Sequence, residues 1–230
     1  MRIRPLATAV SAACLLAASL VVIRAQQPSA SYFGDLHWRS VGPARSGYVS
    51  APAGVPGDPT TYYAGMPEGG VWKTTNGGVT WAPIFDSTGV PSVGAVAIAP
   101  SDHNVIYVGT GNQSGWSFTP GKGVYTSADA GKTWKSSGLT DSQYIGGIAV
   151  DARNAKTALV AAMGPRAGGA GAAANAPASA SAAGTAASAG QERGVYRTTD
   201  GGNSWNRVLP ADGSSGATDV WMDFGDPQFA

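Results

Sequence analysis

Short apolar runs recur along the chain from about residue 46, and clusters of glycine, aspartate, asparagine, serine and threonine separate them. Such runs, bounded by turn-forming residues, predict β-strands. The predicted strands form three consecutive groups: 47–50, 61–65, 70–74 and 80–85; then 94–99, 105–109, 123–127 and 133–136; then 146–150, 158–162, 194–198 and 204–208. A further strand, 218–224, is predicted in the register of the strands that open the second and third groups.

An eight-residue pattern occurs in each group, at 74–81, 127–134 and 198–205. It consists of a hydroxyl residue, a spacer, Asp or Asn, a spacer, Gly, a spacer, Ser or Thr, and Trp. The three copies place Asn76, Gly78 and Trp81; Asp129, Gly131 and Trp134; and Asp200, Gly202 and Trp205 at the matched positions. An Asp or Asn side chain can accept backbone N–H bonds within a tight turn, and Gly supplies a positive φ. The pattern therefore predicts a structural turn between strands, with Trp in a seam between sheets.

A second landmark precedes each turn and gives the length of the repeat. Asp58, Asp102, Asn154 and Asp226 follow one another at distances of 44, 52 and 72 residues. When the extra residues in the second and third copies are discounted, the period stays close to 44 residues. Several short strands in a repeat of this length are typical of a β-propeller blade. A solenoid of β-hairpins is the alternative.

We therefore predict an all-β chain that forms an incomplete β-propeller of four-stranded antiparallel blades. The blades are expected at about 46–90, 91–140 and 141–210, with the first strand of a fourth at 216–230. Propellers close with about four to eight blades, and an open one leaves sheet faces and edges exposed. The chain is thus expected to be the N-terminal part of a longer product whose remaining blades are its partners. A self-associating partial propeller is the alternative.

The first 25 residues predict export. Arg2 and Arg4 precede an Ala-rich apolar segment, and Ala25 is a plausible cleavage residue, so 1–25 is predicted to be a signal peptide. Residues 26–45 are a lead-in to the propeller. The single cysteine, Cys14, lies within the signal, so the mature chain has no thiol. A periplasmic or extracellular location is expected, with no stable membrane span after cleavage. An uncleaved anchor is the alternative.

Composition excludes several kinds of partner and site. The formal net charge is only +1, so the composition does not indicate a strongly basic surface for binding nucleic acid. The chain contains two histidines, His37 and His103, and neither has a second ligand at a metal-binding spacing. No Gly-rich phosphate loop opens a helix. We therefore expect no metal and no cofactor.

The loops between second and third strands carry the candidate binding residues. All of these loops are predicted on one face of the propeller, opposite the repeated turns, and loops commonly carry binding residues. The insertion 112–120 offers Trp116 and Phe118 as an aromatic platform; that they cover a neighbouring blade is the alternative. The longer insertion, 164–190, is of low complexity and is predicted to be disordered. Glu68 is the candidate catalytic carboxylate, or simply a turn residue, and no partner acid can be identified for it.

With the three turns and the Gly-Gly-Val-Trp-Lys-Thr-Thr-Asn-Gly-Gly run at 69–78, the chain resembles the BNR/Asp-box propeller superfamily, from about Trp38 onward. It looks closest to secreted bacterial proteins described as sortilin-like or as glycosyl hydrolases. Xyloglucanase-type relatives carry a catalytic Asp in the first blade, where this chain has Pro67, one residue before Glu68. Sialidases need an arginine cluster, for which Arg45 is the one candidate. Sortilin-type propellers bind peptides.

Two functional hypotheses follow. The first is a secreted, non-catalytic module that binds a peptide or carbohydrate ligand through Trp116, Phe118 and Arg45 on its loop face. The second is the N-terminal part of a glycoside hydrolase, in which Glu68 would act.

Overall fold

The computed structural model describes residues 49–113, 118–164, 192–211 and 215–223. All of them belong to the second of two compact units, Ser40–Ala230. The predicted signal peptide (1–25), the lead-in (26–45), residues 165–190 of the low-complexity insertion and the last residues of the fourth-blade segment (224–230) lie outside the described residues.

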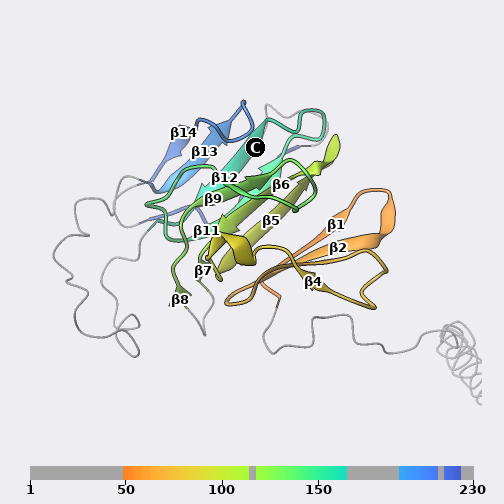
Figure 1. The fold of residues 1–230 in the computed structure, drawn as a ribbon. Helices are drawn as coiled ribbons and strands as arrows, with labels where there is room; N and C mark the ends of the chain where they lie inside the picture. Colours follow the sequence, from red (N-terminus) through yellow and green to blue (C-terminus); the bar gives the residue numbers. More distant parts are fainter. Residues whose placement is uncertain (1–48, 114–117, 165–191, 212–214, 224–230) are drawn as a thin grey trace, which may run out of the picture. The chain divides into compact units, whose positions relative to one another are not determined.

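The described residues form three four-stranded antiparallel sheets, each a meander in which neighbours in sequence are neighbours in the sheet (Figure 1). Blade one contains β1 (Ala51–Val55), β2 (Asp58–Met66), β3 (Gly70–Thr74) and β4 (Ala82–Pro83). Blade two contains β5 (Val93–Ala99), β6 (Asp102–Thr110), β9 (Val124–Ser127) and β10 (Lys135–Ser136). Blade three contains β11 (Ile145–Val150), β12 (Ala158–Ala162), β13 (Gly194–Thr198) and β14 (Asn206–Pro210). The fold is therefore the predicted all-β, incomplete propeller.

The described residues also form two short elements outside these sheets. The 3-10 helix η2 (Asp86–Thr88) lies in the link between blades one and two. A two-stranded hairpin, β7 (Asn112–Gln113) and β8 (Phe118–Thr119), interrupts the connection from β6 to β9. The hairpin lies where a loop insertion was predicted.

The prediction was wrong about the first strand of blade one. Residues 49 and 50 are not in a strand, and β1 begins at Ala51 instead of residue 47. The sequence pattern did not predict β1, because Pro52 and Gly54 are residues that disfavour an interior strand. They are tolerated because β1 is the edge strand of its sheet, next to β2 alone. Its register with β2 shifts between Gly54 and Val55.

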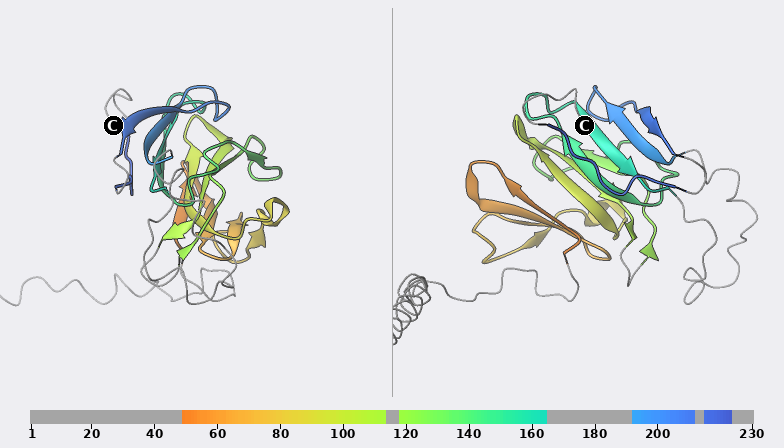
Figure 2. Two further views of the ribbon diagram at one scale, coloured as in Figure 1. Left: turned by 90° about the vertical axis from the view of Figure 1, so that its left-hand side faces the viewer. Right: turned by 180° about the vertical axis from the view of Figure 1, so that it is seen from behind.

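The predicted strand 218–224 is also not found in the described part, which ends at residue 223. The segment 215–223 nevertheless runs along blade three (Figure 2). The Ala217 N–H donates to the Ala162 carbonyl, and Met222 packs with Leu159 and Val195. A strand requires a ladder of backbone hydrogen bonds to a neighbour. None of the described strands provides that ladder for 215–223.

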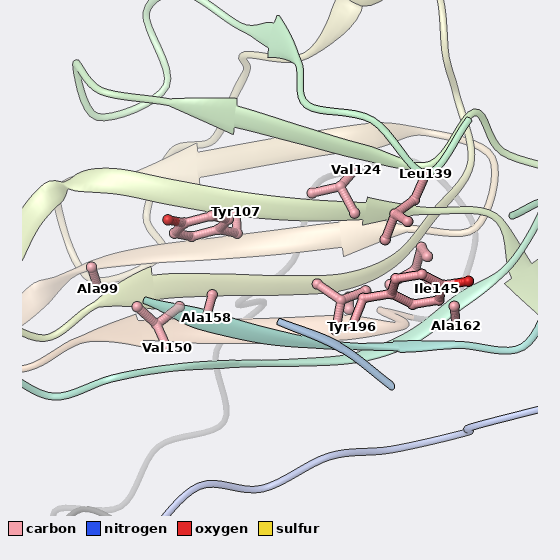
Figure 3. Packing of buried hydrophobic residues seen from close by; sticks show 11 residues of the cluster. Ala99, Tyr107, Val124, Leu139, Ile145, Val150, Ala158, Ala162 and Tyr196 are labelled. Carbon is pink, nitrogen blue, oxygen red and sulfur yellow. The ribbon is translucent and has the colours of Figure 1, made fainter. Parts of the chain in front are cut away.

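Apolar residues from successive blades interdigitate and form the core. Between blades one and two, Tyr63, Val71 and Phe85 pack with Val93 and Ile106, and all five are almost fully buried. Between blades two and three, the cluster in Figure 3 contains Ala99, Tyr107, Val124, Leu139, Ile145, Val150, Ala158, Ala162 and Tyr196. Blade two therefore buries one face against blade one and the other against blade three.

Glycine permits a close approach between blades two and three. A Cβ atom at Gly94 of β5 would meet the backbone carbonyl oxygens of Gly111 and Ile145. Backbone atoms of blades two and three thus come together at a point where no other residue fits.

Candidate functional site

The loops that join second and third strands lie at one end of the blades, together with the links between blades. We call this end the loop face; it comprises the turn 67–69, residues 111–113 and 118–123 with the strands β7 and β8, and the described ends of the 163–193 connection. Backbone hydrogen bonds tie these loops to the links, as in Gly70 N–H to Pro91 O (2.7 Å) and Gly121 N–H to Gln143 O (2.8 Å). The repeated turns lie at the opposite end.

On the loop face, Glu68 of blade one contacts the hairpin of blade two. The Thr119 hydroxyl of β8 donates a hydrogen bond of 2.9 Å to Glu68 Oε1. The Thr119 carbonyl in turn accepts a bond of 2.8 Å from the hydroxyl of Ser92, in the link between the two blades. Thr119 therefore fastens the hairpin to both the turn and the link.

This contact places Glu68 beside the strand that carries another predicted candidate. Phe118 precedes Thr119 in β8, is partly exposed, and pairs with Gln113 of β7. Thr119, which the sequence analysis did not single out, thus holds Glu68 against the strand that carries Phe118. Trp116 and Arg45, the other two binding candidates, lie outside the described residues.

The third loop places another carboxylate on the same face. Glu192 Oε2 accepts the Ser142 backbone N–H at 2.5 Å. Burial raises the pKa of Glu192 above its usual value. The next residue, Arg193, is buried and donates from Nη1 to the Met163 carbonyl at 2.9 Å.

Comparison of the repeats could have found Glu192. Gly70, Gly123 and Gly194 all have positive φ; Gly70 and Gly194 begin the third strand of their blades, and Gly123 directly precedes it. Glu68 and Glu192 both lie two residues before such a glycine. Matched position does not make them a catalytic pair: Glu68 bonds to blade two, whereas Glu192 bonds to the link before its own blade.

The repeated turns have closely similar internal hydrogen bonds. In the second turn, the Ser127 hydroxyl donates to Asp129 Oδ1 at 2.8 Å and accepts the Gly131 N–H at 2.9 Å. The Thr133 hydroxyl donates to Asp129 Oδ2 at 2.6 Å and the Thr133 N–H donates to Oδ1 at 2.8 Å. In the first turn, Asn76 likewise accepts the Thr80 N–H at 2.9 Å.

These bonds stabilise the ionised carboxylates. The hydroxyl and N–H of Thr133, with the hydroxyl of Ser127, lower the pKa of Asp129 to about 2. The hydroxyl and N–H of Ser204 hold the pKa of Asp200 well below its usual range. A carboxylate that is stabilised as the anion and already accepts several bonds is a poor general acid. Its geometry suits a turn.

The tryptophans of the second and third turns reach the preceding blade. Trp134 Nε1 donates to the Ile84 carbonyl at 2.6 Å, and Trp205 Nε1 donates to the Ser137 carbonyl at 2.5 Å. Trp81 Nε1 instead donates to Gly78 O in its own turn, at 3.2 Å.

Concavities also lie elsewhere on the described surface, among them the following two. One, of about 490 Å³, is bordered by the first strands of the three blades and by Asp219–Met222. The other, of about 310 Å³, lies between blades two and three and includes Trp134, Lys156 and Asp200. Each contains a single acidic residue, so neither has the pair of carboxylates that glycoside hydrolysis requires.

The described residues include no group of three His, Cys, Asp or Glu side chains that could hold a metal ion. Within that same part of the chain, no helix is long and apolar enough to cross a membrane.

Comparison with known proteins gives structural likenesses only. No family model matches this sequence, and no curated protein matches it. Three similar solved structures are an ancestral GH74 enzyme (20% identity, TM-score 0.47), the GH74 xyloglucanase from Xanthomonas campestris (19%, 0.49) and YCF48 from Cyanidioschyzon merolae (13%, 0.30). The matches cover 71%, 76% and 76% of this chain, and 19%, 23% and 60% of those chains, respectively. These identities and TM-scores are too low to transfer any residue role to this chain.

Proposed function

We propose that the loop face binds a carbohydrate ligand, and that this part of the chain does so without catalysis. The observation that carries the proposal is the hydrogen bond between Thr119 and Glu68. It joins the hairpin of blade two, which carries Phe118, to the acidic turn of blade one.

The chemistry of this surface suits a sugar better than an apolar ligand. Phe118 is partly exposed and can stack on a pyranose ring, while the Glu68 carboxylate can accept hydrogen bonds from sugar hydroxyls. Trp116 lies two residues before Phe118 in the sequence and would enlarge the platform. A peptide ligand, as bound by sortilin-type propellers, is the alternative occupant of the same surface.

The second candidate function is the N-terminal part of a glycoside hydrolase. Glu68 favours it, because this residue lies beside the Gly69-Gly70 pair that resembles the catalytic turn of xyloglucanase-type enzymes. The position that would hold the acid is Pro67, and Glu68 is bonded to Thr119. Under this alternative the second acid would have to come from residues beyond the described blades.

The setting that we propose is an exported protein of the BNR/Asp-box type. Residues 1–25 would be removed as a signal, and the three blades would continue into further blades of a longer product. The repeated turns, with their Asp or Asn, Gly and Trp residues, would be the Asp-boxes of that superfamily, acting as structural turns.

The two functions differ in a simple assay. The secreted protein is titrated with xyloglucan oligosaccharides by calorimetry, and released reducing sugar is measured over the same preparations. Binding without release supports the non-catalytic proposal. If reducing sugar is released, and Glu68→Gln abolishes this release but retains binding, the non-catalytic proposal is wrong and the hydrolase alternative replaces it. Absence of sugar binding together with capture of an extended peptide would make the peptide the ligand.

A further inference from the structure

The three repeated turns have closely similar backbones at the residue that follows the Asp or Asn. Gly77, Ala130 and Gly201 hold this position, with φ angles of 66°, 58° and 78°. The N–H of each donates to the carbonyl of a residue two positions after its repeat landmark: Gly77 to Thr60 (2.8 Å), Ala130 to Asn104 (2.9 Å) and Gly201 to Lys156 (2.9 Å). The turns therefore differ mainly in the side chain that precedes this N–H.

The first turn has an amide where the other two have a carboxylate. Asn76-Gly77 is the one Asn-Gly pair in the sequence. Asn76 is exposed, and Gly77 has no Cβ atom to hinder its backbone nitrogen from approaching the amide carbon. The matched pair of the third turn, Asp200-Gly201, is unreactive by comparison. The hydroxyl and N–H of Ser204 hold the pKa of Asp200 well below its usual range, and an ionised carboxylate is a poor electrophile.

We propose that Asn76 is a site of spontaneous deamidation, and that the turn accepts the aspartate that results. The Gly77 nitrogen loses its proton to solvent base and attacks Asn76 Cγ. The Cγ–Nδ2 bond breaks, Nδ2 takes a proton from water and leaves as ammonia, and a succinimide ring remains. Water then adds to Cγ and opens the ring to aspartate. The net change is hydrolysis of an amide to a carboxylate, so no oxidant or reductant is needed.

The nitrogen becomes accessible when one hydrogen bond opens. That bond joins Gly77 N–H to the carbonyl of Thr60, and both Thr60 and Asn76 are exposed. Exposed backbone hydrogen bonds open locally at a small fraction of the free energy of global unfolding. The reaction should therefore proceed in the folded protein.

The second turn shows how the product would be held. In the first turn, Asn76 Nδ2 donates to Thr80 Oγ1 at 2.8 Å. In the second turn, the matched hydroxyl of Thr133 instead donates to Asp129 Oδ2 at 2.6 Å. Rotation of the Thr80 hydroxyl hydrogen converts the first arrangement into the second, while the Thr80 N–H keeps its bond to Oδ1. The aspartyl product therefore retains the turn.

A second product is possible in chemistry but does not fit the turn. If water adds to the backbone carbon of the succinimide instead of Cγ, isoaspartate forms. Isoaspartate lengthens the main chain by one methylene and moves the carboxylate away from Thr80. Only the aspartyl product keeps the hydrogen bonds seen in the second turn.

The complete protein, incubated in mildly alkaline water labelled with heavy oxygen, provides the test. Deamidation inserts a labelled oxygen at residue 76, which tandem mass spectrometry locates. Asn104 is the internal control, because it is also exposed but precedes Val105, whose branched side chain hinders the same attack. Gly77→Ala is the matched variant, since Ala130 shows that such a turn accepts alanine. It should slow labelling about tenfold or more, with an unchanged circular dichroism spectrum.

We expect the folded protein to be labelled at Asn76 and not at Asn104. The product should be aspartyl, and its urea midpoint at pH 5 should exceed that of the unreacted protein and equal that of Asn76→Asp. The reason is that a hydrogen-bonded carboxylate stabilises the fold above its unfolded pKa.

Each other outcome overturns the proposal. If Asn76 keeps its amide as long as Asn104 does, or is labelled only in urea, the folded turn is not a deamidation site. Equal labelling of wild type and Gly77→Ala would exclude attack by the Gly77 nitrogen. A mainly isoaspartyl product with a lower urea midpoint would show that the turn does not accept the product.

The proposal is independent of the ligand of the loop face, because the repeated turns lie at the opposite end of the blades. Failure of sugar binding leaves it intact, and an unreactive Asn76 leaves the carbohydrate proposal intact.

Discussion

The indole Nε1 of Trp134 donates a 2.6 Å hydrogen bond to the backbone carbonyl of Ile84, fifty positions earlier in the chain. The same indole ring packs edge-on against Phe85. One side chain therefore satisfies a backbone acceptor of the preceding blade and fills the seam beside it. Trp205 makes the corresponding bond to the Ser137 carbonyl, so the same contact occurs at both seams between the described blades.

Removal of the Trp134 ring should loosen the seam between blades one and two. We predict that Trp134→Ala lowers the free energy of unfolding by about 3 kcal/mol, because it leaves a cavity against Phe85. Trp134→Phe keeps most of the ring but removes the N–H donor, and should lower it by about 1 kcal/mol. Urea unfolding followed by circular dichroism measures both.

Trp81 provides the matched control for the hydrogen bond. Its indole donates within its own turn rather than to another blade. Trp81→Phe should therefore destabilise less than Trp134→Phe. Equal effects of the two substitutions would show that the bond across the seam contributes nothing of its own.

The carboxylate of Asp129 should make stability depend on pH in the acid range. Its hydrogen bonds lower its pKa in the folded protein to about 2, whereas an unfolded aspartate titrates near a pKa of about 3.9. The stabilisation is therefore complete above about pH 4 and is lost as the pH falls towards 2. The urea midpoint of the wild type should decline across this interval.

Asp129→Asn separates this titration from other acid effects. Asn76 shows that an amide supports the same turn, with the Thr80 N–H bonded to its Oδ1. The variant should fold, with a urea midpoint below that of wild type at pH 5 and nearly equal to it at pH 2. A difference that stays constant from pH 5 to pH 2 would contradict the assigned role of the carboxylate.

The close approach at Gly94 predicts a large effect from a small substitution. A methyl group there would meet two backbone carbonyl oxygens, which cannot rotate away as a side chain can. We predict that Gly94→Ala lowers the free energy of unfolding by about 3 kcal/mol. Gly54→Ala is the control, because its Cβ would lie 3.6 Å from the Tyr62 ring, an ordinary contact. Comparable melting temperatures for the two variants would contradict a close approach of backbones at Gly94.

The partly exposed ring of Phe118 should matter for ligand binding more than for folding. Phe118→Ala is expected to weaken binding of a xyloglucan oligosaccharide about tenfold, equivalent to about 1.4 kcal/mol, with little change in melting temperature. Val79→Ala, at an exposed position on the opposite face, should change neither quantity. A parallel loss of stability and binding in Phe118→Ala would identify Phe118 as a packing residue.

Sequence predicted those parts of the fold that depend on local pattern. Most strands of blades two and three were located within a few residues, because apolar runs and positive-φ glycines mark their ends. β1 was missed because Pro52 and Gly54 interrupt its apolar pattern. β4 is shorter than predicted: it contains only Ala82–Pro83 of the expected residues 80–85. Such outer strands have few buried residues to define their length.

The candidate site was less predictable, because it depends on contacts between distant parts of the chain. Glu68 and Thr119 are separated by 51 residues, and no periodicity in a single sequence indicates which loop side chains will meet. The same is true of the Ile84 carbonyl, since a backbone acceptor has no residue-specific signal. The hairpin of β7 and β8 lacks the apolar alternation of a longer strand.

The most direct measurement is the calorimetric affinity of the Thr119→Val protein for a xyloglucan oligosaccharide, beside that of Thr60→Val. Both variants lose a threonine hydroxyl that bonds a carboxylate: Thr119 to Glu68 on the loop face at 2.9 Å, and Thr60 to Asp58 on the opposite face at 2.7 Å. If the loop face binds the sugar, Thr119→Val should weaken binding about tenfold and Thr60→Val should leave it unchanged. Equal affinities in the two variants would contradict a binding surface built on the Glu68–Thr119 contact.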